Sequence, residues 1–171
     1  MSAWRVIGFV IGVLIVASPA RALDPGLATL DAGERGRVVE VIDGDTVVLE
    51  TGLQVRLAGV QAPKLPLGRA GFVAWPLADE AKAALANLAL GHDVELRYVG
   101  RTRDRHGRAL AHLVVDGALW AQGAMIDARM ARVYSFPDNR ALVGDLLARE
   151  ARARGATGHL GRSVLSRAQP R

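Results

Sequence analysis

The sequence of 171 residues predicts an α+β protein, a five-stranded β-barrel with three α-helices. Two observations predict this class. Short runs of alternating apolar and polar residues, rich in valine and leucine, recur between tight-turn signals. Other segments place apolar residues three or four positions apart, which is the spacing of one helix face. The chain has no cysteine, so we expect neither a disulfide framework nor a thiolate metal site.

The first 22 residues differ in kind from the rest. A short basic start, MSAWR, precedes the 12-residue apolar run VIGFVIGVLIVA, and Ala20-Arg21-Ala22 has the small-x-small pattern of a cleavage site. A bilayer span needs roughly 20 apolar residues, so we expect no stable membrane span. Residues 1–22 are predicted to be a signal peptide for export to the periplasm or the medium, with an uncleaved N-terminal anchor as the alternative.

Three strands are predicted in the next part of the chain. Residues 23–35 combine proline, glycine and acidic residues without a sustained period, and are predicted to be a linker. The β-rich runs that follow are RVVEVI, TVVLE and LQVRLAGV. They are separated by Asp43-Gly44-Asp45 and Thr51-Gly52, which suit tight antiparallel turns. The pattern therefore predicts a three-stranded meander.

A long loop and a helix come next. The stretch QAPKLPLGRAGFVAWP, residues 61–76, contains three prolines and two glycines and is predicted to be irregular. A loop of that length in a compact domain is usually functional or mobile. In LADEAKAALANLAL, one apolar stripe runs along a predicted helix that ends at Gly91. The stripe consists of Leu77, Ala81, Leu85 and Leu88.

The remaining elements complete a barrel. Two alternating strands, DVELRYV and ALAHLVV, flank the arginine-rich turn GRTRDRHGR. GALWAQGAMIDARMARV is predicted to be the second helix, and NRALVGDLLAREARARG the third, capped by Asp138. Residues 156–171 show no period and are predicted to be a flexible tail. Five short strands with a helix between the third and fourth is the plan of an OB-fold, here over residues 36–155.

Candidate metal and phosphate ligands lie on the predicted strands. Asp43 and Asp45 flank a glycine, and two such carboxylates can share a hard cation, although Asp-Gly is also a common hairpin turn. Arg56 lies in an apolar strand, where an inward arginine needs an anionic partner; the alternative is an edge arginine that faces solvent. Arg108 begins the last strand. If the barrel closes, Arg56 and Arg108 converge on one groove as a phosphate clamp.

Two histidines are weaker candidates for a general base. They are His106, in the arginine-rich turn, and His112, which alternates with Leu110 along the last strand and is expected to face solvent. Asp79 and Glu80, at the start of the first helix, are an alternative if the preceding loop lets one of them reach the site.

Four separated motifs resemble the staphylococcal-nuclease-like (thermonuclease) family in sequence and order. They are VIDGDTVVL, VRLAGVQAP, RTRDRHGRALAHL and ARVYSFPDNR, with a helix after the second. The resemblance covers residues 36–155 and implies an OB-fold nuclease domain that hydrolyses phosphodiesters of DNA and RNA with Ca²⁺. It also implies that Arg56 and Arg108 contact the scissile phosphate and that Asp45 is a calcium ligand.

Two positions depart from the family pattern Asp-x-Pro-Glu, in which the aspartate binds calcium and the glutamate is the proposed general base. Gln61 and Lys64 stand there instead. The site is then three charge units more positive than the family pattern, so we expect a much reduced affinity for calcium. Lys64 in its protonated form cannot take a proton from water, so it cannot act as the general base that the glutamate is proposed to be.

Two functions stay open at this point. One is a metal-dependent phosphodiesterase or endonuclease with weak or altered activity, in which Arg56 and Arg108 act on the phosphate and Lys64 replaces the glutamate. The other is a non-catalytic module that binds nucleic acid or another anion through Arg56, Arg108 and Lys64. In both, Gln61 is a candidate for substrate binding.

Overall fold

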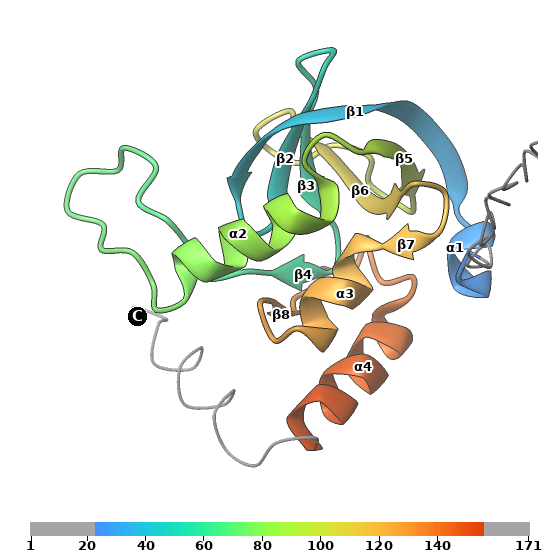
Figure 1. The fold of residues 1–171 in the computed structure, drawn as a ribbon. Helices are drawn as coiled ribbons and strands as arrows, with labels where there is room; N and C mark the ends of the chain where they lie inside the picture. Colours follow the sequence, from blue (N-terminus) through green and yellow to red (C-terminus); the bar gives the residue numbers. More distant parts are fainter. Residues whose placement is uncertain (1–22, 156–171) are drawn as a thin grey trace, which may run out of the picture.

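The predicted barrel is present in residues 23–155, the part of the chain that the computed structural model describes (Figure 1). Its five strands are β1 (Asp31–Asp43), β2 (Thr46–Leu49), β3 (Gln54–Leu57), β5 (Asp93–Tyr98) and β6 (Ala109–Val115). Neighbouring strands pair antiparallel in the order β3-β2-β1-β5-β6. A parallel pairing of β3 with β6 closes the barrel and places Arg56 opposite Leu110. The two strands that carry the predicted clamp are therefore neighbours.

Strand β1 pairs with two different strands, β5 along its first half and β2 along its second half, because it is long and irregular. It pairs with β5 through residues 31–37 and with β2 through residues 38–43. Register shifts interrupt both ladders, which bends the strand and increases its twist. This bend lets one strand of 13 residues close a small barrel.

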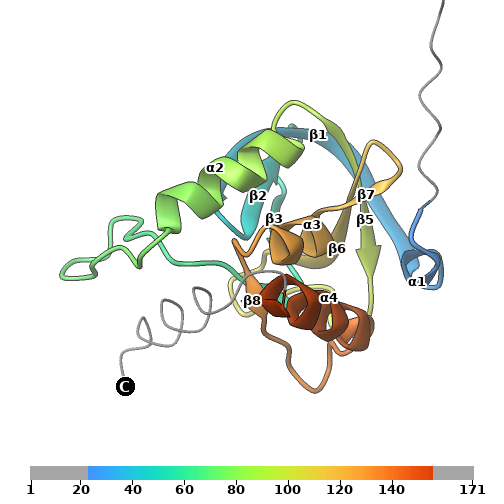
Figure 2. The same cartoon turned by 60° about the horizontal axis from the view of Figure 1, so that its bottom comes forward.

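Short strands and four helices complete the described part of the chain. Strand β4 (Val60–Gln61) pairs with β8 (Arg132–Val133), and β7 (Leu119–Trp120) pairs antiparallel with the end of β6. The helices are α1 (Pro25–Ala28), α2 (Ala78–Ala89), α3 (Ala121–Asp127) and α4 (Val143–Gly155). Helix α2 crosses one end of the barrel, and α3 and α4 lie side by side on its outside (Figure 2). Within these residues no helix is long and apolar enough to cross a membrane.

The core fills the barrel and the space beneath the helices. Its largest fully buried apolar side chains come from strands and helices alike: Leu27, Leu49, Leu57, Leu85, Leu96, Leu113, Met125, Ile126 and Leu146. Burial of apolar surface at about 25 cal/mol per Å² is what holds α2, α3 and α4 on the barrel.

The predicted linker over residues 23–35 is different in the structure. Helix α1 lies there, and β1 begins at Asp31, which pairs with Tyr98. Leu27 is fully buried, so this segment belongs to the folded domain. The sequence did not indicate this strand, because the first half of β1 is exposed at most positions and therefore lacks the alternation of apolar and polar residues. The predicted signal peptide and flexible tail lie outside the described residues.

The three predicted helices correspond to α2, α3 and α4, with shorter bounds. In α2 the buried face is formed by Ala78, Ala81, Leu85 and Ala89, whereas Leu77 precedes the helix in a left-handed conformation (φ 65°) and is 38% exposed. Helix α4 begins at Val143, so Asp138 does not cap it. The residues between Pro137 and α4 form an irregular segment beside the cavity described below.

His112 is buried, which corrects the expectation that it faces solvent. Both faces of β6 are covered, one by the barrel core and the other by α3 and the Trp120 side chain. The Trp120 indole N–H donates a hydrogen bond to His112 Nδ1 over 3.2 Å, and burial lowers the pKa of His112 to about 4. His112 is therefore a neutral core residue and does not line the cavity described below.

This burial predicts a pH-dependent stability. Unfolded His112 binds a proton at a pKa of about 6.5, whereas the folded side chain does so only at about 4. The free energy of unfolding should therefore fall by roughly 3 kcal/mol as the pH is lowered through this interval. His112→Asn keeps an acceptor for Trp120 and should flatten the profile, whereas the exposed His106→Asn should not. Urea denaturation at a series of pH values measures this, and equal slopes in the two variants would contradict it.

The turn between β1 and β2 predicts a second effect, on packing. A Cβ atom on Gly44 would lie 2.6 Å from Ala62 Cβ, 2.7 Å from Ala81 Cβ and 3.1 Å from the Ala81 carbonyl carbon. Gly44→Ala should therefore push α2 from the turn and lower the free energy of unfolding by roughly 1–3 kcal/mol. Gly144→Ala is the control, because its methyl group meets no atom within 4 Å. Thermal and urea unfolding of the two variants compare them, and equal stabilities would be inconsistent with the tight contact.

Candidate functional site

The Asp43-Gly44-Asp45 turn forms the buried floor of the site. Asp43 ends β1, Asp45 precedes β2, and both carboxylates are almost completely buried. Asp43 Oδ1 accepts a hydrogen bond from the backbone N–H of Asp45 over 3.1 Å. Asp45 Oδ2 accepts another from the backbone N–H of Ala62 over 2.8 Å, which attaches the start of the long loop to the turn. The two acids thus sit between the barrel and α2, where Gly44 permits close approach.

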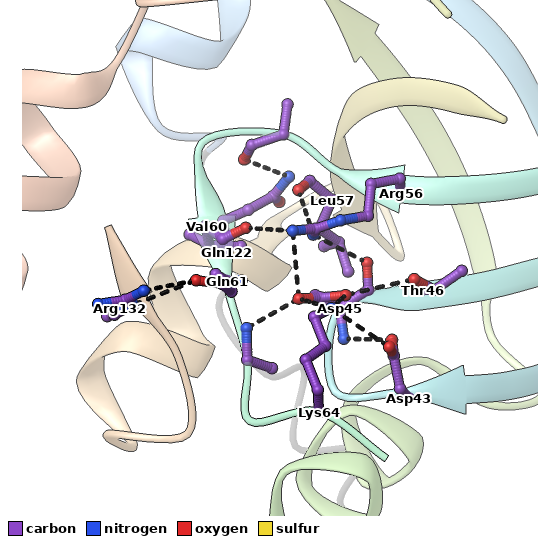
Figure 3. A network of polar contacts seen from close by, with 12 residues as sticks. Asp43, Asp45, Thr46, Arg56, Leu57, Val60, Gln61, Lys64, Gln122 and Arg132 are labelled. Atoms are coloured by element: carbon purple, nitrogen blue, oxygen red, sulfur yellow. Dashed lines mark hydrogen bonds and ion pairs between the residues drawn. The ribbon is translucent and has the colours of Figure 1, made fainter. Parts of the chain in front are cut away.

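Lys64 extends from the long loop and places its ammonium group on these carboxylates (Figure 3). Its Nζ lies 2.6 Å and 2.7 Å from the two oxygens of Asp45 and 3.3 Å from Asp43 Oδ2. An ammonium group has three N–H donors, and three carboxylate oxygens surround it here. Lys64 is thus directed at the acids and does not line the cavity with Arg56 and Arg108.

Arg56 lies on the other side of Asp45. Its Nη2 is 3.2 Å from Asp45 Oδ2 and donates to the carbonyl of Val60 over 2.8 Å. Its Nη1 donates to the carbonyls of Leu57 (2.8 Å) and Asp45 (3.3 Å). The inward arginine with an anionic partner is confirmed, and the solvent-facing alternative is wrong. These carbonyls and the carboxylate fix the orientation of the guanidinium before any ligand binds.

Arg108 is oriented by Asp104, an acid of the arginine-rich turn. Asp104 Oδ2 accepts from Arg108 Nε over 2.7 Å, while Oδ1 accepts from the backbone N–H groups of His106 and Arg108. Arg108 Nη1 reaches Thr46 Oγ1 at 3.5 Å, and this hydroxyl donates to Asp45 Oδ1 at 3.3 Å. Thr46 therefore connects the second arginine to the same buried carboxylate that holds Arg56.

The two acids of the floor have opposite pKa shifts. Burial raises the pKa of Asp43, and the negative charge of Asp45 raises it further. Burial also acts to raise the pKa of Asp45, but the charges of Arg56 and Lys64 outweigh it and lower that pKa. Asp45 is thus the firmly ionised member of the pair, and its charge is balanced by a guanidinium and an ammonium group.

Gln61 faces away from the two acids. Its side-chain oxygen accepts hydrogen bonds from Arg132 Nη2 (2.7 Å) and Nε (3.3 Å), across the pairing of β4 with β8. The structure does not bring Gln61 to the cavity wall with Arg56 and Arg108. The direction of this side chain is set by Arg132, a residue for which the sequence suggested no role.

A cavity of about 820 Å³ opens beside the two arginines. Its wall includes four arginines, two acids and two aromatic side chains: Arg56, Arg101, Arg105, Arg108, Asp104, Asp138, Tyr134 and Phe136. Tyr134 is 40% exposed and Phe136 is 55% exposed, and their rings meet edge to face at 5.2 Å. Neither aromatic residue was assigned a role from the sequence, although the Tyr-Ser-Phe-Pro stretch within the ARVYSFPDNR motif was a usable signal.

The donor set does not fit the calcium site that the resemblance implies. Calcium takes six to eight oxygen ligands, and Asp43 and Asp45 already bind the Lys64 ammonium. Within residues 23–155 no group of three or more histidine, cysteine or acidic residues could hold a metal ion. Asp79 and Glu80 are exposed and make no side-chain hydrogen bond or ion pair with other described residues, so nothing here supports either as a replacement base.

The closed barrel agrees with a comparison to known protein families. The family model for staphylococcal nuclease homologues matches residues 54–160, and the chain belongs to this family. The chain is also similar to protein ParB of Escherichia coli, with 32% identity over 156 residues, which cover 85% of this chain and 76% of that protein. The relationship is therefore to a nuclease family.

The ammonium group between the two carboxylates predicts a large effect on stability. Lys64→Met removes the ammonium group that contacts both buried carboxylates, leaving Arg56 as the cation beside Asp45, and should lower the free energy of unfolding at neutral pH by roughly 3–5 kcal/mol. The loss should shrink in acid, because the stability that comes from the lowered pKa of Asp45 is present above a pH of about 3.9 and is lost below it. Urea denaturation compares this variant with Lys82→Met in α2. Equal stability of the two would contradict a structural role of Lys64.

Proposed function

We propose that this domain binds single-stranded nucleic acid, or a chemically similar phosphodiester, in the cavity beside Arg56 and Arg108, and does not cleave it by the metal-dependent reaction of its family. One observation carries the proposal. A single cavity places two oriented guanidinium groups next to two exposed aromatic rings, Tyr134 and Phe136. Guanidinium groups bind phosphate oxygens, and aromatic rings stack on bases that are not paired. Membership of a nuclease family supports the same class of ligand.

The hydrogen bonds of the arginines support a binding surface that exists before the ligand arrives. Arg56 is held by three carbonyls and by Asp45, so its position costs little entropy on binding. Arg108 uses Nε and Nη2 for Asp104, while the contact of Nη1 with Thr46 is long, at 3.5 Å. Nη1 of Arg108 is therefore the better placed donor for a phosphate oxygen.

Binding is favoured over hydrolysis by the state of Lys64. Hydrolysis of the family's kind needs a base near the attacking water, and the position of that base holds an ammonium group in contact with two carboxylates.

We also propose that the protein acts outside the cytoplasm, which the predicted signal peptide at residues 1–22 supports.

The proposal predicts that binding depends on Arg108 and Phe136. Arg108→Ala should weaken binding of a fluorescent single-stranded oligonucleotide about tenfold or more, since a hydrogen bond to a charged group contributes roughly 1.5–3 kcal/mol. Phe136→Ala should weaken it by a similar factor through lost stacking. Wild-type affinity should fall steeply with salt. Fluorescence anisotropy of the full chain measures these changes.

Arg152→Ala is the matched control, because Arg152 is an exposed arginine of α4 outside the cavity. Equal losses in Arg108→Ala and Arg152→Ala would show that binding is not at the cavity. Gel analysis of the same oligonucleotides should show them intact in calcium and in chelator. Calcium-dependent cleavage that Arg108→Ala abolishes would instead favour a phosphodiesterase.

A further inference from the structure

We propose that the Lys64 ammonium takes the place of the divalent cation in this domain, so that the arginine pair is held ready for an anion with no metal bound. The identity of that anion rests on the proposed function, but the claim about the metal does not. The family's acids and ion are replaced here by a cation that belongs to the chain itself.

The position of the ammonium supports this exchange. Nζ lies 2.6 Å and 2.7 Å from the oxygens of Asp45, only slightly farther than the 2.3–2.6 Å of a calcium–oxygen bond. It also contacts Asp43 at 3.3 Å. A calcium ion that used these oxygens would have to displace Lys64 or lie against its positive charge. The two carboxylates thus have a cation at the point where they converge.

The charge of the site supports it as well. Asp43, Asp45, Gln61 and Lys64 together carry a charge of about minus one when the acids and the lysine are ionised. With acids at positions 61 and 64 and one calcium ion, the same four positions would carry about minus two. The surroundings of Arg56 in this chain without metal thus differ by one charge unit from a metal-loaded site of the family pattern, whereas they differ by three units from the same site without its metal.

The loop holds the ammonium in place. Lys64 lies between Pro63 and Leu65-Pro66, and Pro63 is buried. The backbone carbonyl of Lys64 accepts a hydrogen bond from the N–H of Trp75 over 2.9 Å, which joins the two ends of the protruding loop (Figure 1). Restricted φ angles at the prolines and this hydrogen bond reduce the entropy lost when the side chain meets the acids. A cation tethered in this way does not depend on the calcium concentration.

The experiment is a calcium titration of the purified full chain by calorimetry, with three variants. Lys82→Glu changes the chain's other lysine and is the control. Wild type and Lys82→Glu should show no calcium binding beyond that of Asp45→Asn, which lacks the Asp45 carboxylate. Lys64→Glu should bind about one Ca²⁺ per chain, at least tenfold more tightly than Lys82→Glu, and calcium should raise its Tm. Calcium binding by wild type that Asp45→Asn removes would overturn the proposal. So would a folded Lys64→Glu that binds no better than Lys82→Glu.

A second measurement decides the case if Lys64→Glu does not fold at any calcium concentration. Oligonucleotide binding by the wild-type chain should be the same within about twofold in calcium and in chelator, whereas a calcium requirement would overturn the inference. If no oligonucleotide binds under any condition, the proposed ligand is wrong. In that case the calcium titration of wild type and Asp45→Asn still decides whether Lys64 excludes the metal.

Discussion

The buried carboxylate of Asp45 is the group on which the site depends. An isolated ionised carboxylate at full burial would be very unfavourable, so it must be satisfied by several donors at once. These donors come from separate elements: the Thr46 hydroxyl from β2, Arg56 from β3, and the Ala62 N–H and Lys64 ammonium from the long loop. Each of these segments is fixed relative to the others because they share one pair of oxygen atoms.

Closure of the barrel brings this carboxylate close to the second arginine. The parallel pairing of β3 with β6 places the start of β6 beside Arg56, and Arg108 immediately precedes that strand. Asp104 turns the Arg108 guanidinium toward Thr46 and the cavity. The pocket is thus built by pairing that joins distant parts of the chain, with each arginine oriented by an acid from a turn. Its net charge is modest because most cavity arginines also face an acid, so the exposed aromatic rings are expected to contribute to the proposed binding.

Much of the fold, but less of the site, could be predicted from the sequence. Alternation and turn residues predicted the barrel strands, and Arg56 in an apolar strand correctly indicated an inward side chain with an acid. The burial of His112 could not be predicted by alternation, because α3 covers the face of β6 that would otherwise be in solvent. The directions of Gln61 and Lys64 also depend on tertiary partners, Arg132 for one and the two acids for the other. Sequence spacing alone does not contain these pairings.

The surroundings of Gln61 and Lys64 are physically consistent with one another. Once an ammonium group neutralises Asp45, a further acid at position 61 is not needed to bind a cation, and the neutral amide of Gln61 can accept two hydrogen bonds from Arg132. To restore a metal site, the Lys64 ammonium must first be removed from between the Asp43 and Asp45 carboxylates. A change at position 61 matters only after that. The Lys64 ammonium supplies positive charge to the two carboxylates, but it has no open coordination position for water, which is what a catalytic metal supplies.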